Sequence, residues 1–78
     1  MSMRIRLTNH AQARLLERGV EPTDIRTAMT SPDKRVPAQG GKMEVHKKIG
    51  KKTLVVIYSK EQFRDKKEEY SVVTAYYI

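Results

Sequence analysis

Three ionisable residues recur at every fourth position of the segment NHAQARLLERG: His10, Arg14 and Arg18. At 3.6 residues per turn, positions spaced by four stay on one side of a helix, so these side chains form a row. Guanidinium groups can grip a phosphate through paired hydrogen bonds, and an imidazole can exchange protons near neutral pH. The row is therefore a candidate anion site. Because Glu17 lies beside it, the alternative interpretation is a solvated helix face held by local ion pairs.

Cleavage of RNA without a metal ion makes three chemical demands. A base must take the proton of the 2′-hydroxyl, cations must offset the charge of the crowded phosphate, and an acid must protonate the leaving oxygen. His10 is a candidate for the base or the acid, and Arg14 and Arg18 are candidate phosphate ligands. The helix row alone therefore lacks one proton-transfer group.

The missing group has to come from the second half of the chain. His46 is the first candidate, with Tyr76 or Tyr77 after it, and Lys47 and Lys48 are further candidate substrate ligands. Two alternatives stay open. His46 can be a surface imidazole among lysines, and strand tyrosines commonly pack half-buried instead of stacking on bases.

Length and charge limit the classes of protein to which the chain can belong. Seventy-eight residues allow a single domain, spanning 1–78, with a small core. Sixteen Lys and Arg against nine Asp and Glu give a net charge of +7. This bias favours a polyanionic partner: nucleic acid first, an acidic protein second and an anionic membrane third.

Other chemistries are disfavoured by what the sequence lacks. It has no Cys, two His and no phosphate-loop or dinucleotide motif, so we expect no metal site and no cofactor. The longest apolar run is too short to span a bilayer, and the charged N-terminus has no apolar stretch typical of a signal peptide. We therefore expect a cytoplasmic protein without membrane contact.

The elements that position these residues follow from hydrophobic periodicity and from Gly and Pro. The expected ranges are a strand at 4–7, helices at about 9–18 and 22–31, strands at 34–38, 43–49 and 53–59, a charged loop at 60–69 and a strand at 70–78. The predicted fold class is α+β, with two N-terminal helices packed on one face of a three- to four-stranded antiparallel sheet. Its core is expected to contain Leu15, Ile25, Met29, Val56 and Val73.

The predicted helix at 9–18, together with segments that follow it, resembles a known family. The matching residues are Thr8-Asn9-His10-Ala11, Arg14, Glu17-Arg18-Gly19-Val20, Asp24-Ile25, Ser31-Pro32-Asp33 and the strand motif Val72-Val73-Thr74. The chain resembles the domain-of-unknown-function family 4258, which is similar in fold to the RelE, ParE and BrnT toxins. That resemblance implies a RelE-like fold and makes RNA a plausible target. It does not by itself imply cleavage, since this fold also occurs in toxins that are not nucleases.

Three hypotheses follow. The first is a small basic RNA-directed, RelE-like toxin-type domain, with metal-independent ribonuclease activity as its candidate reaction. The second is a non-catalytic module that binds nucleic acid or an acidic, antitoxin-like protein. The third is an inactive relative, in which Arg14 or Arg18 is bridged internally to Glu17, Asp24 or Glu44.

Overall fold

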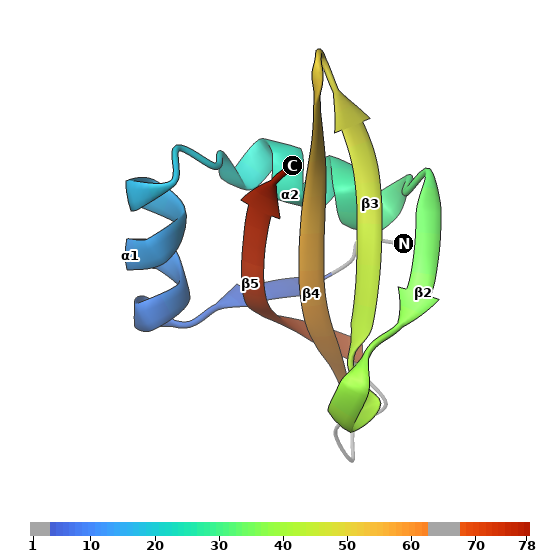
Figure 1. The fold of residues 1–78 in the computed structure, drawn as a ribbon. Helices are drawn as coiled ribbons and strands as arrows, with labels where there is room; N and C mark the ends of the chain where they lie inside the picture. Colours follow the sequence, from blue (N-terminus) through green and yellow to red (C-terminus); the bar gives the residue numbers. More distant parts are fainter. Residues whose placement is uncertain (1–3, 63–67) are drawn as a thin grey trace.

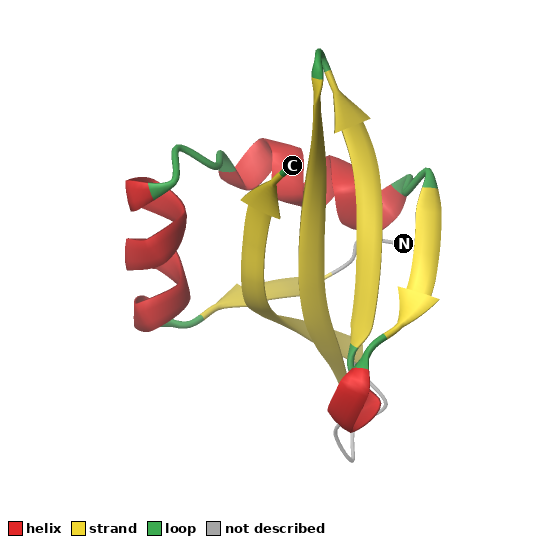
Figure 2. Cartoon of the chain, in the orientation of Figure 1, coloured by secondary structure: helices red, strands yellow, loops and turns green. Residues whose placement is uncertain are grey.

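Two helices and one five-stranded sheet make up the part of the fold that the structure describes (Figure 1, Figure 2). The structure is a computed structural model and describes residues 4–62 and 68–78. The strands are β1, Arg4–Leu7; β2, Lys34–Pro37; β3, Met43–Ile49; β4, Lys52–Gln62; and β5, Glu68–Tyr77. The helices are α1, Asn9–Glu17; α2, Pro22–Thr30; and a single 3-10 turn, η1, at Gln39–Gly41.

The sheet is mixed, with the strand order β1-β5-β4-β3-β2. Strands β2 to β5 are antiparallel neighbours, whereas β1 pairs with β5 in parallel, with Ile5 opposite Tyr70. The prediction of a three- to four-stranded antiparallel sheet behind two N-terminal helices is therefore wrong. A strand precedes the helices and joins the sheet as a fifth, parallel strand. Four alternating residues predict a strand but not its partner, and a parallel partner lies beyond a long crossover.

Local signals explain where the helices begin and end. The Thr8 hydroxyl accepts a hydrogen bond from the Ala11 N–H at 3.1 Å and so caps α1. Gly19 ends this helix with a φ of 68°, a left-handed conformation that glycine adopts without strain. Pro22 opens α2, where its missing N–H costs no hydrogen bond. Neither described helix has the length and apolar character that crossing a bilayer requires.

The hydrophobic core lies between the helices and one face of the sheet. In Figure 1, α2 lies behind β3 and β4, while α1 stands beside β5. The predicted core residues Leu15, Ile25, Met29 and Val56 are all buried, which confirms that part of the prediction. The opposite face of the sheet, towards the viewer in Figure 1, carries neither of the two helices.

Val73 is the exception, because its side chain is 44 % exposed. The pairing of β4 with β5 shifts register between Ile57 and Tyr58, and Val73 is the extra residue on β5. Val72 and Ala75 are both buried in the helix-facing core, so the two residues between them are turned away from it. The prediction that Val73 lies in the core is therefore wrong, since a β-bulge breaks the alternation on which it rested.

The charged segment predicted as a loop at 60–69 is mostly strand where the structure describes it. Strand β4 continues to Gln62 and β5 begins at Glu68, so the two strands stay paired across the range 60–62 and 68–70. Residues 63–67, which the predicted loop also includes, lie outside the described residues.

Candidate functional site

The face of the sheet without helices, here called the open face, brings together side chains from four strands. The register places Lys34, His46, Val55 and Tyr76 side by side in one row across β2, β3, β4 and β5. Directly paired residues point to the same side of a sheet, so all four belong to this face. The row therefore joins two predicted proton-transfer residues, His46 and Tyr76, with a lysine that the sequence did not indicate as a partner.

His46 has a carboxylate partner on its own strand. Its Nε2 atom lies 2.7 Å from Oε2 of Glu44, and both side chains are partly buried. A carboxylate can only accept a hydrogen bond, so Nε2 carries the proton and, in the neutral ring, Nδ1 is left as the acceptor. Glu44 thus fixes both the orientation and the tautomer of the imidazole, which is what a general base requires of its neighbour.

Val55 lies between the two candidate proton-transfer residues on the open face. Its side chain is only 1 % exposed, although the described helices lie on the other side of the sheet. The residues that can cover it are its neighbours on the open face, above all the rings of His46 and Tyr76 directly beside it. Two strand spacings separate the backbones of these residues by about 10 Å. Because Val55 is covered, a phosphate on this face would contact the rings of His46 and Tyr76 and not Val55 itself.

Arg18 connects α1 to this face. Its Nη1 donates hydrogen bonds to the Thr74 hydroxyl at 3.0 Å and to the Ala75 carbonyl at 3.1 Å. Strand β1 pairs with β5 only as far as Val72, so the guanidinium supplies a donor where the neighbouring strand has ended. Arg18 therefore has a structural contact in addition to its predicted role as a phosphate ligand.

The other members of the helix row remain apart from the sheet. Within the described ranges, His10 and Arg14 are exposed, and their side chains take part in no hydrogen bond or ion pair. Helix α1 stands beside β5, so β5 and β4 separate it from β3, which carries His46. The structure therefore brings Arg18 to the open face but does not bring His10 and His46 together. No ion pair joins Arg14 or Arg18 to a described acidic residue, contrary to what the inactive-relative hypothesis requires.

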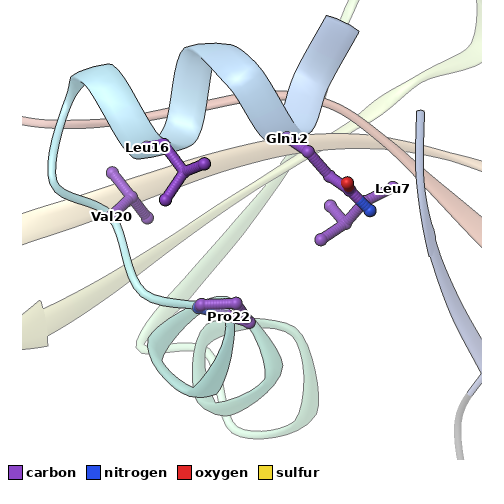
Figure 3. Close-up of a pocket in the computed structure, with 5 residues that line it drawn as sticks. All are labelled: Leu7, Gln12, Leu16, Val20 and Pro22. Carbon is purple, nitrogen blue, oxygen red and sulfur yellow. The ribbon is translucent and has the colours of Figure 1, made fainter. Parts of the chain in front are cut away.

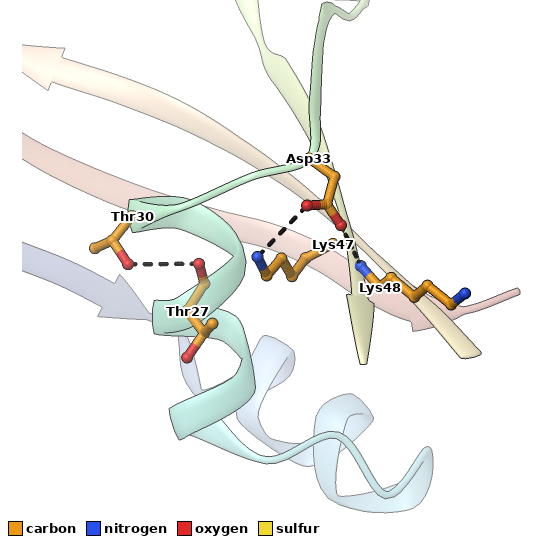
Figure 4. Close-up of polar contacts among 5 residues, drawn as sticks. All are labelled: Thr27, Thr30, Asp33, Lys47 and Lys48. Carbon is orange, nitrogen blue, oxygen red and sulfur yellow. Dashed lines mark hydrogen bonds and ion pairs between the residues drawn. The ribbon is translucent and has the colours of Figure 1, made fainter. Parts of the chain in front are cut away.

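Lys47 and Lys48 lie on opposite faces, as neighbouring strand residues must. Figure 4 shows both contacting Asp33: the Lys47 ammonium lies 3.5 Å from Oδ1, and the Lys48 backbone N–H donates to Oδ2 at 2.8 Å. The hydrogen bond from Lys48 and the nearby Lys47 charge lower the pKa of the Asp33 carboxyl. The Lys48 ammonium is exposed on the open face, so only this lysine of the predicted pair can join a ligand there.

Tyr77 also lies on the face opposite to its neighbour. Its hydroxyl donates to Asp24 Oδ2 at 3.1 Å and so ties the end of β5 to the first turn of α2. Burial, together with this hydrogen bond and the Asp24 charge, raises the pKa of the Tyr77 hydroxyl. Tyr76, not Tyr77, is thus the tyrosine available to the open face.

An apolar hollow of about 210 Å³ lies on the helix side of the molecule (Figure 3). It is lined by Leu7, Gln12, Leu16, Val20 and Pro22. Leu16, at 81 % exposed, forms part of its rim. None of the lining residues is ionisable, so the hollow offers no proton-transfer chemistry.

Glu44, Lys34 and Thr74 are the residues of the open face that the sequence did not identify as part of a site. A signal for Glu44 was present, since residues 44, 46 and 48 alternate on one side of a strand. Lys34 and Thr74 depend on the strand register and on the bulge, which the sequence does not reveal. In comparisons with known proteins, no family model, curated protein or solved structure matches the chain.

Proposed function

We propose that the protein is a small basic RNA-directed domain that binds RNA through the open face of its sheet. The observation that carries the proposal is the cross-strand row in which the Glu44–His46 pair, Lys34 and Tyr76 lie on one face of a chain with a net charge of +7. The resemblance to a toxin-related family, in which RNA is a plausible target, supports the same partner.

The lysines of the described strands differ between the two faces of the sheet. On the helix side, Lys47 is paired with Asp33, and the Lys52 ammonium lies 5.7 Å from the centre of the Tyr77 ring. On the open face, Lys34 and Lys48 form no ion pair with any described residue. Unpaired cations next to an aromatic ring suit a ligand that carries both phosphates and bases.

Metal-independent cleavage of the bound RNA is the second candidate, and the 2.7 Å Glu44–His46 contact favours it. His46 Nδ1 would take the proton of a 2′-hydroxyl, whose oxygen forms a bond to the adjacent phosphorus while the bond to the 5′-oxygen breaks. The Tyr76 hydroxyl would protonate the leaving 5′-oxygen, and Lys34 would offset the charge of the phosphorane. The products are a 2′,3′-cyclic phosphate and a 5′-hydroxyl.

Fluorescence anisotropy with an unstructured labelled RNA tests the binding proposal. The double variant Lys34→Ala/Lys48→Ala should raise the Kd by about 2- to 30-fold, given roughly 0.2–1 kcal/mol for each exposed charge contact. The double variant Lys47→Ala/Lys52→Ala removes the same charge from the other face and should leave the Kd nearly unchanged. Equal losses in both double variants would mean that net charge, and not this face, determines binding.

The same RNA, incubated with excess protein and a chelator, tests cleavage. We expect His46→Ala to lower the rate by about 10²- to 10⁴-fold while affinity stays nearly constant, because a general base acts on the transition state. His10→Ala is the matched control, and its rate should equal that of the wild type. If His10→Ala abolishes turnover and His46→Ala keeps it, the general base is His10 of α1 and not His46. Binding without turnover in the wild-type protein would leave a non-catalytic binding module.

A further inference from the structure

The open face continues beyond the His46–Tyr76 row, towards the β1 edge of the sheet. There the register places Ser59, Ser71 and Arg6 side by side across β4, β5 and β1. Arg6 is exposed and forms no ion pair with any described residue, and the two serines are half-buried beside it. This second row combines a free guanidinium with two hydroxyl groups, which are hydrogen-bond donors suited to a phosphate.

The first and second rows are separated by a distance that only an extended ligand can span. Val55 and Ser59 mark the two rows on β4, and four strand residues correspond to about 14 Å. Between the rows lie Ile57, which is partly exposed, and Val73, which the bulge leaves 44 % exposed. Glu44, whose carboxylate binds His46, lies beside Ile57 on β3. The surface between the two sets of polar groups is thus partly apolar and open to the faces of bases.

We propose that the Arg6–Ser59–Ser71 row is a second phosphate-binding subsite, so that a single strand of RNA crosses the open face from β3 to β1. This inference rests on the proposed RNA-binding function. It adds that the ligand is single-stranded and states the path that it follows across the sheet. Alternating cations and apolar surface are the features by which proteins bind single strands without reading their sequence. In a duplex, by contrast, base pairing and stacking would keep the bases from the apolar strip between the rows.

Two ligands of different length separate this inference from the proposed function. A dinucleotide with one phosphate can occupy only one row, whereas a strand of about ten nucleotides can span both. For the longer strand, Arg6→Ala should raise the Kd about two- to fivefold and reduce the slope of log K against log salt by about 0.7. Binding of the dinucleotide, followed by NMR chemical shifts at His46 and Tyr76, should stay unchanged in this variant.

Arg26→Ala is the control, since Arg26 is an exposed arginine of α2, on the other side of the sheet. Arg6→Lys keeps the charge and should restore most of the affinity, which also tests whether a loss in Arg6→Ala reflects misfolding. If Arg6→Ala binds the longer strand like the wild type while Lys34→Ala/Lys48→Ala does not, the second subsite is overturned and the proposed function stands. A duplex that binds as tightly as the single strand would overturn the single-stranded path. No binding of either ligand by the wild-type protein would overturn the proposed function itself.

Discussion

Adjacent side chains of this sheet have different tasks because successive strand residues point to opposite faces. Tyr76 faces the open surface while Tyr77 binds Asp24, and Lys48 extends its ammonium to solvent while Lys47 pairs with Asp33. The sequence presents each pair as two equivalent candidates. Once the face is known, one member of each pair becomes a site candidate and the other a structural residue, which provides a matched control.

Tyr77→Phe should weaken the fold by about 1 kcal/mol at neutral pH, since it removes the hydrogen bond to Asp24. The pKa of Tyr77 is raised above its ordinary value of 10.0 in the folded state, so folding favours the neutral hydroxyl. Its contribution is therefore complete below pH 10 and is lost as the pH rises towards the raised pKa.

Urea denaturation of the wild type and Tyr77→Phe, in parallel from neutral to alkaline pH, measures this contribution directly. Lysine deprotonation affects both proteins alike and cancels in the difference between their free energies of unfolding. We expect this difference to shrink above pH 10. A difference that grows with pH would contradict the proposed coupling between Tyr77 and Asp24.

Among the elements, the helices were the easiest to predict and the pairing of strands the hardest. Thr8, Gly19 and Pro22 are local signals, and the observed ends of α1 and α2 follow from them. The parallel partner of β1 and the bulge at Val73 arise from contacts between distant segments, for which a single sequence carries no local signal. For the same reason the sequence identified His46 as a candidate but not the Lys34 and Tyr76 row in which it lies.

Strands β5 and β3 each extend beyond the end of one neighbouring strand. There, side chains form hydrogen bonds with the backbone in place of the missing strand. Arg18 donates to the Ala75 carbonyl of β5 beyond the end of β1, and Asp33 accepts from the Lys48 N–H of β3 beyond the end of β2. These contacts satisfy backbone groups that would otherwise form an open strand edge. They also connect each helix, or the loop after it, to the sheet.

The α1–β5 contact predicts different effects for the two arginines of the helix row. Arg18→Ala should lower the free energy of unfolding by about 1 kcal/mol, which corresponds to about 4–8 °C in Tm for a domain of this size. Arg14→Ala should change it by less than about 0.5 kcal/mol, because Arg14 is exposed and its side chain forms no hydrogen bond to the described residues. Thermal melts of both variants measure the contrast, and equal losses would show that Arg18 does not hold α1 to the sheet.

For the molecule as a whole, the excess of positive charge acts on folding and on binding in opposite directions. The chain has sixteen Lys and Arg against nine Asp and Glu, while two ion pairs, one of them involving His46, occur within the described ranges. With seven more cationic than acidic side chains, we expect repulsion among cations to outweigh the attraction that salt would screen. In RNA binding, by contrast, the same cations are the attractive groups, and added salt competes with them.

Raising the sodium chloride concentration from about 0.05 to about 0.5 M should consequently increase the Tm while it weakens RNA binding. The first effect follows from screening of repulsion within the folded chain, with a Debye length that falls well below about 10 Å over this range. The second follows from counterion release. Scanning calorimetry and anisotropy titrations in the same buffers measure both.

Lys34→Ala/Lys48→Ala should make both the Tm and the Kd less dependent on salt, since these unpaired lysines contribute to both. A Tm that falls with salt would mean that attraction between opposite charges, and not repulsion among cations, dominates the electrostatics of the folded chain.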